Sequence, residues 1–191
     1  MTIKEITTKK KKNTSNSEKT NEEKEDMFKE EIKIDQILLH NRNIFLTGVI
    51  DEKKAHEIVT KLTALSVYQE SPIVLWINSR GGSVTDGFAI IDTMVGIKAP
   101  VFTIINGKAL SMGGIISIFG QKRMMTENSY WMAHDVYTGR DDYVTKLEDS
   151  IEFSKNLQSR IFEMFRRKTK LTEKDLEKAR HGELWLDAKT C

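Results

Sequence analysis

The sequence has a single cysteine among its 191 residues, and that residue, Cys191, comes last. One thiol can neither close an internal disulfide nor supply the ligand set of a structural zinc site. A disulfide-stapled domain is therefore excluded, and a reducing, cytoplasmic compartment is the simplest interpretation.

Long apolar runs and an excess of charge of one sign are missing as well. The longest apolar runs, 100–106 and 110–120, are shorter than a membrane-spanning helix, and no charged-then-apolar leader opens the chain. Thirty basic residues against 28 acidic ones leave a formal charge of only +2. We therefore expect neither a membrane nor a nucleic-acid partner, and the 39% of hydrophobic residues suits one globular domain.

The N-terminal segment is charged and almost without apolar side chains. A lysine run at 9–12 is followed by an acid-rich run at 22–26, and nearly nothing apolar precedes Met27. Such a segment cannot bury enough surface to offset the entropy lost on ordering. We expect a disordered tail over residues 1–35 and a folded domain over 36–191; a basic binding arm is the alternative for the lysine run.

Short apolar runs alternate with helical periodicity from residue 43 onward. Asp51 can cap the first helix, and Pro72 and Pro100 each open an apolar run where a strand tolerates a missing N–H. The expected strands are 44–50, 73–78, 101–106 and 129–134. Three helices are expected: one with an apolar stripe over 55–65, a crossover helix at 84–97 and a long amphipathic helix at 141–168. This alternation is typical of an α/β fold whose parallel sheet is covered on both faces.

Two glycine-containing segments follow expected strands, at the sheet edge where α/β proteins bind ligands. Gly81 and Gly82 can let the backbone approach a ligand or aim N–H groups at an anion, or can simply form a tight turn. Ser111 precedes an apolar helix, where free N–H groups favour a developing oxyanion. It is either a nucleophile or only the N-cap of that helix.

A serine nucleophile needs a base, and the chain has four histidines. His40 lies near the polar tail, His56 lies on the first helix, and His181 lies in a charged region. His134 ends an expected strand and enters a polar turn, where it can take a proton from a serine and return it to a leaving group. A purely structural histidine is the alternative.

Four blocks of the sequence, 77–84, 86–94, 107–114 and 132–134, together resemble the ClpP family of serine peptidases, in order and at matching separations. The resemblance spans about residues 43–188. It implies a crotonase-like fold, in which stacked β-α-β units form a head and the long helix forms a protruding handle. It also implies two stacked heptameric rings (a tetradecamer), and a hexameric AAA+ ATPase that unfolds protein substrates and feeds them in. ATP would be used by that partner, with no cofactor or metal on this chain.

The resemblance also implies roles for single residues. Ser111 matches the nucleophile and His134 the general base, and backbone N–H groups of Gly81, Gly82 and Met112 match the oxyanion hole. Attack on a peptide carbonyl would give an acyl-enzyme that water then hydrolyses. A separate implication concerns an aromatic residue in the cleft that docks the ATPase, which matches Trp76.

The sequence departs from the family pattern in three places. Arg80 replaces the usual proline before the glycine pair. Counting back from the stretch 185–188 places the usual triad aspartate at Ala179, and Glu177 and Glu183 are the nearby acids for the role of orienting the histidine. Family chains continue past the point where this one stops, so we expect the final C-terminal element to be lacking.

Three alternatives to an active serine–histidine peptidase follow. A chain without an orienting carboxylate could be a catalytically weak ring subunit that serves assembly and ATPase docking. Crotonase-like enzymes also bind acyl-CoA thioesters, although no basic cluster is placed for the CoA phosphates. A serine–lysine peptidase would use Lys108 as its base, but His134 makes that chemistry the weaker hypothesis.

Overall fold

A computed structural model describes residues 34–137 and 143–191 and divides the chain into two compact units, Met1–Ile37 and Leu38–Cys191. A short helix runs through residues 34–40, and the rest of the expected tail lies outside the described residues. The tail and its boundary stay predictions. The architecture below is that of the second unit.

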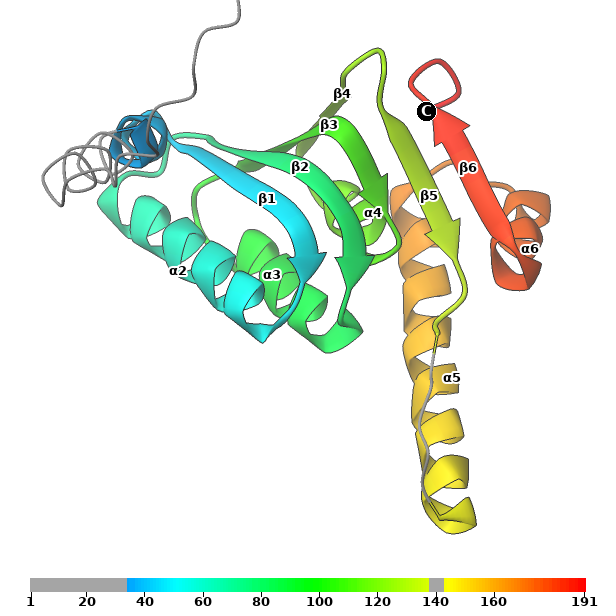
Figure 1. Ribbon diagram of the computed structural model, residues 1–191. Helices are drawn as coiled ribbons and strands as arrows, with labels where there is room; N and C mark the ends of the chain where they lie inside the picture. The colour runs from blue at the N-terminus through cyan, green and yellow to red at the C-terminus, as the bar shows by residue number, and fades with distance from the viewer. Residues whose placement is uncertain (1–33, 138–142) are drawn as a thin grey trace, which may run out of the picture. The chain divides into compact units, whose positions relative to one another are not determined.

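One mixed sheet organises this unit, with strand order β1-β2-β3-β5-β6 and β4 beside β3 (Figure 1). All neighbouring strands are parallel except β5 and β6. The strands are β1 Asn43–Ile50, β2 Ile73–Gly82, β3 Val101–Leu110, β4 Lys122–Met125, β5 Tyr130–His134 and β6 Glu183–Asp187. The predicted α/β class is confirmed. The folded unit begins with two consecutive β-α-β units, one from β1 to β2 and one from β2 to β3.

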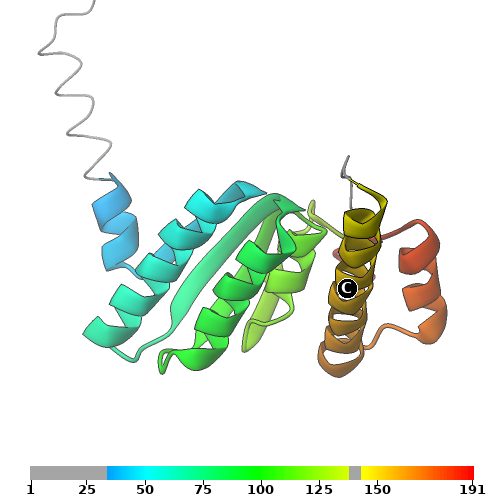
Figure 2. The same cartoon turned by 90° about the horizontal axis from the view of Figure 1, so that it is seen from below.

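Helices α2 Glu52–Tyr68 and α3 Val84–Gly96 lie side by side on one face of the sheet (Figure 2). The predicted cap is confirmed, because the Asp51 carboxylate accepts a hydrogen bond of 2.8 Å from the N–H of Lys54. Ile58 and Leu62 of α2 are fully buried against the core. Along β1 and β2, buried side chains alternate with more exposed ones, so no described helix covers the face of these strands opposite α2 and α3. The prediction that the sheet is covered on both faces is therefore wrong for β1 and β2.

Strands β2 and β3 run further than their apolar segments predicted. β2 continues through the glycine pair, which pairs with Val49 and Ile50 of β1 after a shift in register. β3 continues to Leu110, pairing first with β4 and then, over Lys108 to Leu110, with β5. Glycine usually ends a strand pattern, but here positive φ angles at Gly81 and Gly82 bend the strand without ending it.

The long helix α5, Val144–Lys168, confirms the predicted amphipathic helix and its basic last turn, while residues 141 and 142 lie outside the described part. Its C-terminal half packs on the core through Ile161, Phe162 and Phe165, each at most 3% exposed. Its N-terminal half extends beyond the strands (Figure 1), and there Ile151 is 47% and Phe153 55% exposed.

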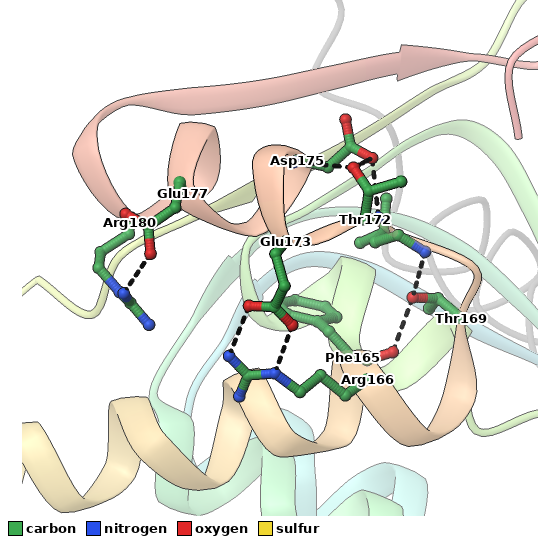
Figure 3. Close-up of polar contacts among 9 residues, drawn as sticks. Phe165, Arg166, Thr169, Thr172, Glu173, Asp175, Glu177 and Arg180 are labelled. Carbon is green, nitrogen blue, oxygen red and sulfur yellow. Dashed lines mark hydrogen bonds and ion pairs between the residues drawn. The ribbon is translucent and has the colours of Figure 1, made fainter.

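A polar network joins α5 to helix α6, Glu173–His181, which precedes β6 in the chain (Figure 3). The Arg166 guanidinium donates two hydrogen bonds to the Glu173 carboxylate, at 2.8 and 3.0 Å. Thr172 and Asp175 form a capping box at the start of α6. The Arg180 guanidinium lies 4.9 Å from the centre of the Phe162 ring. Neither α6 nor β6 was predicted from the sequence.

Acidification is expected to destabilise this network. The hydrogen bond from Arg166 lowers the pKa of Glu173, and the hydrogen bond from the Thr172 hydroxyl lowers the pKa of Asp175. Because the pKa values of both carboxyl groups are lower in the folded state, the ionised groups stabilise the fold fully at pH values above their unfolded-state pKa values. This stabilisation is lost as the pH falls below about 4. Urea midpoints measured between pH 7 and 3 should show this loss.

Two variants test the origin of that loss. Glu173→Gln should make the urea midpoint less sensitive to pH, since the side chain no longer titrates. Glu152→Gln, which changes an exposed position of α5 without a described ion pair, should keep the wild-type slope. Equal slopes in all three proteins would mean that this ion pair contributes nothing.

Candidate active site

Ser111 lies at a sharp turn between β3 and the short helix α4, Met112–Ser117. Its φ of 53° and ψ of −124° place a non-glycine residue in a region that L-residues rarely adopt. Two backbone hydrogen bonds hold the turn: the Ser111 N–H donates to Met132 O at 2.8 Å, and Ser111 O accepts from the Ile115 N–H at 3.1 Å. The strain is therefore maintained by β5 on one side and α4 on the other.

The hydroxyl of Ser111 does not cap the helix that follows it. The residue occupies the N-cap position, but its side chain makes no capping hydrogen bond and, within the described residues, has no hydrogen-bond partner. The residue is only half-buried. The N-cap alternative is therefore not supported, and the hydroxyl is available for chemistry.

Gly81 brings β2 against the serine turn. A Cβ atom at Gly81 would lie 2.7 Å from both Leu110 O and Ser111 Cβ, and 3.0 Å from Met112 N. Only glycine fits this approach, and its φ of +92° favours glycine as well. The pair is therefore not a simple tight turn, because it holds backbone beside the candidate nucleophile.

The predicted oxyanion donors differ in availability. The Gly81 N–H donates to Ser79 Oγ at 3.0 Å, so it is already used inside the strand. Gly82 and Met112 both line a cavity with Ser111. The Met112 N–H is the first of α4 and has no carbonyl partner within that helix. Two of the three expected donors, Gly82 and Met112, therefore lie at the cavity.

That cavity, of about 320 Å³, brings the candidate nucleophile and base together. His134 ends β5 and lines the cavity with Ser111, as sequence analysis anticipated for a strand-end histidine. No hydrogen bond joins the two side chains in the described structure. Lys108 is exposed on β3 and does not line the cavity, which disfavours the serine–lysine alternative. The lining residues are Gly82, Val84, Ser111, Met112, Ile115, His134, Asp135, Val136, Tyr137 and Ile161.

A larger hollow of about 850 Å³ lies elsewhere, beside β4 and the end of β6. Its walls are mainly apolar, and it contains neither Ser111 nor His134. We therefore place the chemistry in the smaller cavity.

The strand register points to one of the two weaker candidates for the third triad position. Glu183 opens β6 directly opposite His134, and Trp185 Nε1 donates a hydrogen bond of 2.7 Å to Glu183 Oε2. Ala179 is fully buried in α6, and Glu177 is bound on the exposed surface of that helix by Arg180. Of the acids considered, Glu183 is therefore the one that the strand register places opposite His134.

Trp76 forms an aromatic pair with Phe45 on the uncovered face of β1 and β2. The two rings are stacked, with centroids 6.0 Å apart and planes 8° apart. The Trp76 indole N–H donates to Asn43 Oδ1 at 2.8 Å, which fixes the ring, while Phe45 is 38% exposed.

Comparison with known proteins identifies the family. The family model described as Clp protease matches residues 8–191. The chain belongs to the Clp protease family. It is 32% identical over 173 residues to the ATP-dependent Clp protease proteolytic subunit 2 of Treponema denticola, covering 89% of this chain and 86% of that protein.

Two further Clp protease relatives give the same result. The chain is 35% identical over 161 residues to the ATP-dependent Clp protease proteolytic subunit of Streptococcus mutans, covering 80% of each chain. It is 34% identical over 161 residues to that of Lactococcus lactis, covering 80% of this chain and 79% of the relative. The sequence-based predictions of ClpP family membership and of a serine-type peptidase are confirmed. The acyl-CoA alternative receives no support.

Membrane-spanning helices and metal-binding clusters are both absent from the described residues. Over 34–137 and 143–191, no helix is both long enough and apolar enough to cross a membrane. Nor does this part of the chain gather three or more histidine, cysteine or acidic side chains into a group that could hold a metal ion.

Proposed function

We propose that this Clp protease subunit cleaves peptide bonds with Ser111 as nucleophile and His134 as general base. The observation that carries the proposal is the shared cavity, which joins an uncapped serine hydroxyl, a histidine and the backbone of Gly82 and Met112. Labelling of the intact protein by a fluorophosphonate, localised by peptide mass spectrometry to residue 111, tests it.

The mechanism follows from these groups. Ser111 Oγ attacks the scissile carbonyl carbon while His134 takes the hydroxyl proton. The carbonyl oxygen becomes an oxyanion, which the N–H groups of Gly82 and Met112 stabilise. His134 then gives the proton to the leaving amine, and an acyl-enzyme remains. Water attacks this ester with His134 again acting as base, which releases the second product and restores Ser111.

Glu183 supplies the third group in this proposal. Directly opposed residues of an antiparallel pair have Cβ atoms about 5 Å apart, a separation that a glutamate side chain can span to an imidazole. Trp185 occupies one carboxylate oxygen, so the other can accept the Nδ1–H of His134. A carboxylate there would hold the ring in the tautomer that accepts the serine proton.

A catalytically weak ring subunit is the second candidate function. One observation favours this role: among the described residues of a single chain, no hydrogen bond links the side chains of Ser111, His134 and Glu183. In this case the chain would contribute to ring assembly and ATPase docking beside an active relative. Cleavage of a short fluorogenic peptide by the purified chain alone, at a rate typical of peptidases, would exclude this role.

Assembly and localisation complete the proposal. The relatives are named ATP-dependent proteolytic subunits, which supports a ring-forming subunit that receives unfolded substrates from an AAA+ ATPase. We propose two stacked heptameric rings joined through the exposed half of α5, and docking of the hexameric ATPase at Phe45 and Trp76. ATP would bind only that partner, this chain would need no cofactor, and the complex would work in the cytoplasm.

Replacing Ile151 with aspartate is expected to separate the rings. Ile151 is 47% exposed on α5, and a charge there would have to be buried without a partner if the rings stack at this face. Native mass measurement should show a one-ring species or smaller assemblies in place of the two-ring species. Asn156→Asp adds the same charge at an exposed position of the same helix and should leave the mass unchanged. An unaltered mass for Ile151→Asp would refute stacking through this face.

A further inference from the structure

Arg80 occupies a bulge beside the candidate active site. The register between β1 and β2 passes from Gly48 opposite Ser79 to Val49 opposite Gly81, so Arg80 is the extra residue of β2. Bulges commonly redirect a side chain next to a functional site. Arg80 is exposed and immediately precedes the glycine that touches the serine turn.

The position of Arg80 on the strand places it within reach of a substrate. Burial alternates at the end of β2, and Asn78, Arg80 and Gly82 are its exposed positions. Gly82 lines the cavity that contains Ser111. Alternate residues of a strand lie about 6.6 Å apart, which is comparable with the length of an arginine side chain. A peptide whose carbonyl lies between Gly82 and Ser111 therefore passes within reach of the Arg80 guanidinium.

The charge of Arg80 is not used inside the described structure. No ion pair, hydrogen bond or aromatic contact involves its guanidinium in that part of the chain. Arg42 differs, because its guanidinium donates to four backbone carbonyls, and Arg166 is held by Glu173. An arginine is charged at any physiological pH and presents a planar set of donors that fits a carboxylate.

The acidic residue of the cavity lining, Asp135, does not neutralise the charge of Arg80. Asp135 lines the cavity together with His134, and its Oδ1 accepts a hydrogen bond of 2.6 Å from the Val136 N–H. No ion pair forms between Asp135 and Arg80 among the described residues. Among the described residues, the cavity lining therefore holds a carboxylate after β5, while the cationic Arg80 lies on β2 two residues before Gly82 of that lining.

We propose that Arg80 is a specificity residue that binds the carboxylate of an aspartate or glutamate side chain close to the scissile bond of the substrate. This inference rests on the proposed function of Ser111. A substrate carboxylate can take both parallel N–H donors of the guanidinium, whereas the neutral amide of glutamine offers one acceptor oxygen.

Matched fluorogenic peptides test the proposal. Each pair differs only by glutamate or glutamine at one position within about three residues of the scissile bond, a span of about 10 Å along an extended chain. At one of these substrate positions, the kcat/KM of the wild type should be about two- to fivefold higher for the glutamate peptide than for the glutamine peptide at low salt, the size of effect expected for an exposed ion pair. The preference should fall as salt is added and should appear mainly in KM.

Variants of Arg80 assign the preference to this residue. Arg80→Ala should remove the glutamate preference, Arg80→Lys should keep part of it, and Arg80→Glu should reverse it. Lys98→Ala is the matched control, since Lys98 is 80% exposed and precedes β3 at the end remote from Ser111. It should leave both rate and preference unchanged.

The outcomes separate this inference from the proposed function. Equal cleavage of both peptides at every position, or a preference that survives in Arg80→Ala, overturns the role of Arg80. If no peptide is cleaved and Ser111 stays unlabelled, the proposed function fails. In that case, fluorescence anisotropy measures binding of the labelled glutamate and glutamine peptides to Ser111→Ala and to Ser111→Ala/Arg80→Ala. Tighter binding of the glutamate peptide only when Arg80 is present supports the inference, and equal binding overturns it.

Discussion

Replacing Ser111 with alanine is expected to abolish fluorophosphonate labelling and to lower peptide cleavage by about a million-fold, the scale seen when a serine peptidase loses its nucleophile. The substitution removes one oxygen atom. It leaves the backbone strain nearly unchanged, because alanine and serine both carry a Cβ at the φ of 53°. The loss should therefore reflect chemistry rather than folding, which circular dichroism and native mass measurement check.

Ser159→Ala is a matched control for this experiment. Ser159 lies on the exposed side of α5, where its hydroxyl donates to Lys155 O at 2.9 Å. This variant should be labelled and should cleave peptides like the wild type. If Ser111→Ala still reacts with the probe, the label lies on another side chain, and the proposal for Ser111 is wrong.

Replacing Glu183 with glutamine is expected to lower kcat by about a hundred- to ten-thousand-fold, as for loss of the orienting carboxylate in other serine peptidases. Glutamine keeps the size of the side chain and can still accept the hydrogen bond from Trp185. It offers no charge to stabilise the protonated His134, and its amide can favour the wrong tautomer. Steady-state cleavage of a short peptide measures the effect, and Glu183→Asp should retain more activity than Glu183→Gln.

Glu177→Gln is the control, since Glu177 is the other acid weighed for this position and is bound on α6 to Arg180 and His181. It should cleave peptides at nearly the wild-type rate. A large loss in this variant with no loss in Glu183→Gln would reverse the assignment. A wild type that is already very slow, and that loses nothing on Glu183→Gln, would favour the weak ring subunit.

Much of the fold could be predicted because its signals are local. The apolar run of β1, the cap at Asp51 and the stripe of α2 each depend on neighbouring residues in the chain, and the structure confirms all three. The ends of β2 and β3 were predicted too short, since glycine and polar residues interrupt the apolar pattern. Their continuation depends on pairing with β1 and β5, which a single strand does not reveal.

The candidate site was predicted in part for the same reason. His134 ends an apolar strand that the sequence pattern predicts, whereas Ser111 follows β3 and was singled out by its place before an apolar helix and by the family resemblance. The third position did not, because β6 has only five residues and its register against β5 is a tertiary property. The loss of Gly81 as a donor was equally hidden, as it depends on the rotamer of Ser79.

Strand β3 changes its neighbouring strand along its length, and this pairing limits local opening of the backbone next to Ser111. Phe102 to Ile105 pair with β4 and Lys108 to Leu110 with β5, while β2 lies along the other side. A central strand bonded on both sides separates from its neighbours only in large opening events. We therefore expect the Ser111 amide, which follows β3 and donates to Met132 O, to exchange slowly with solvent, and we expect β6, at the sheet edge, to open more readily.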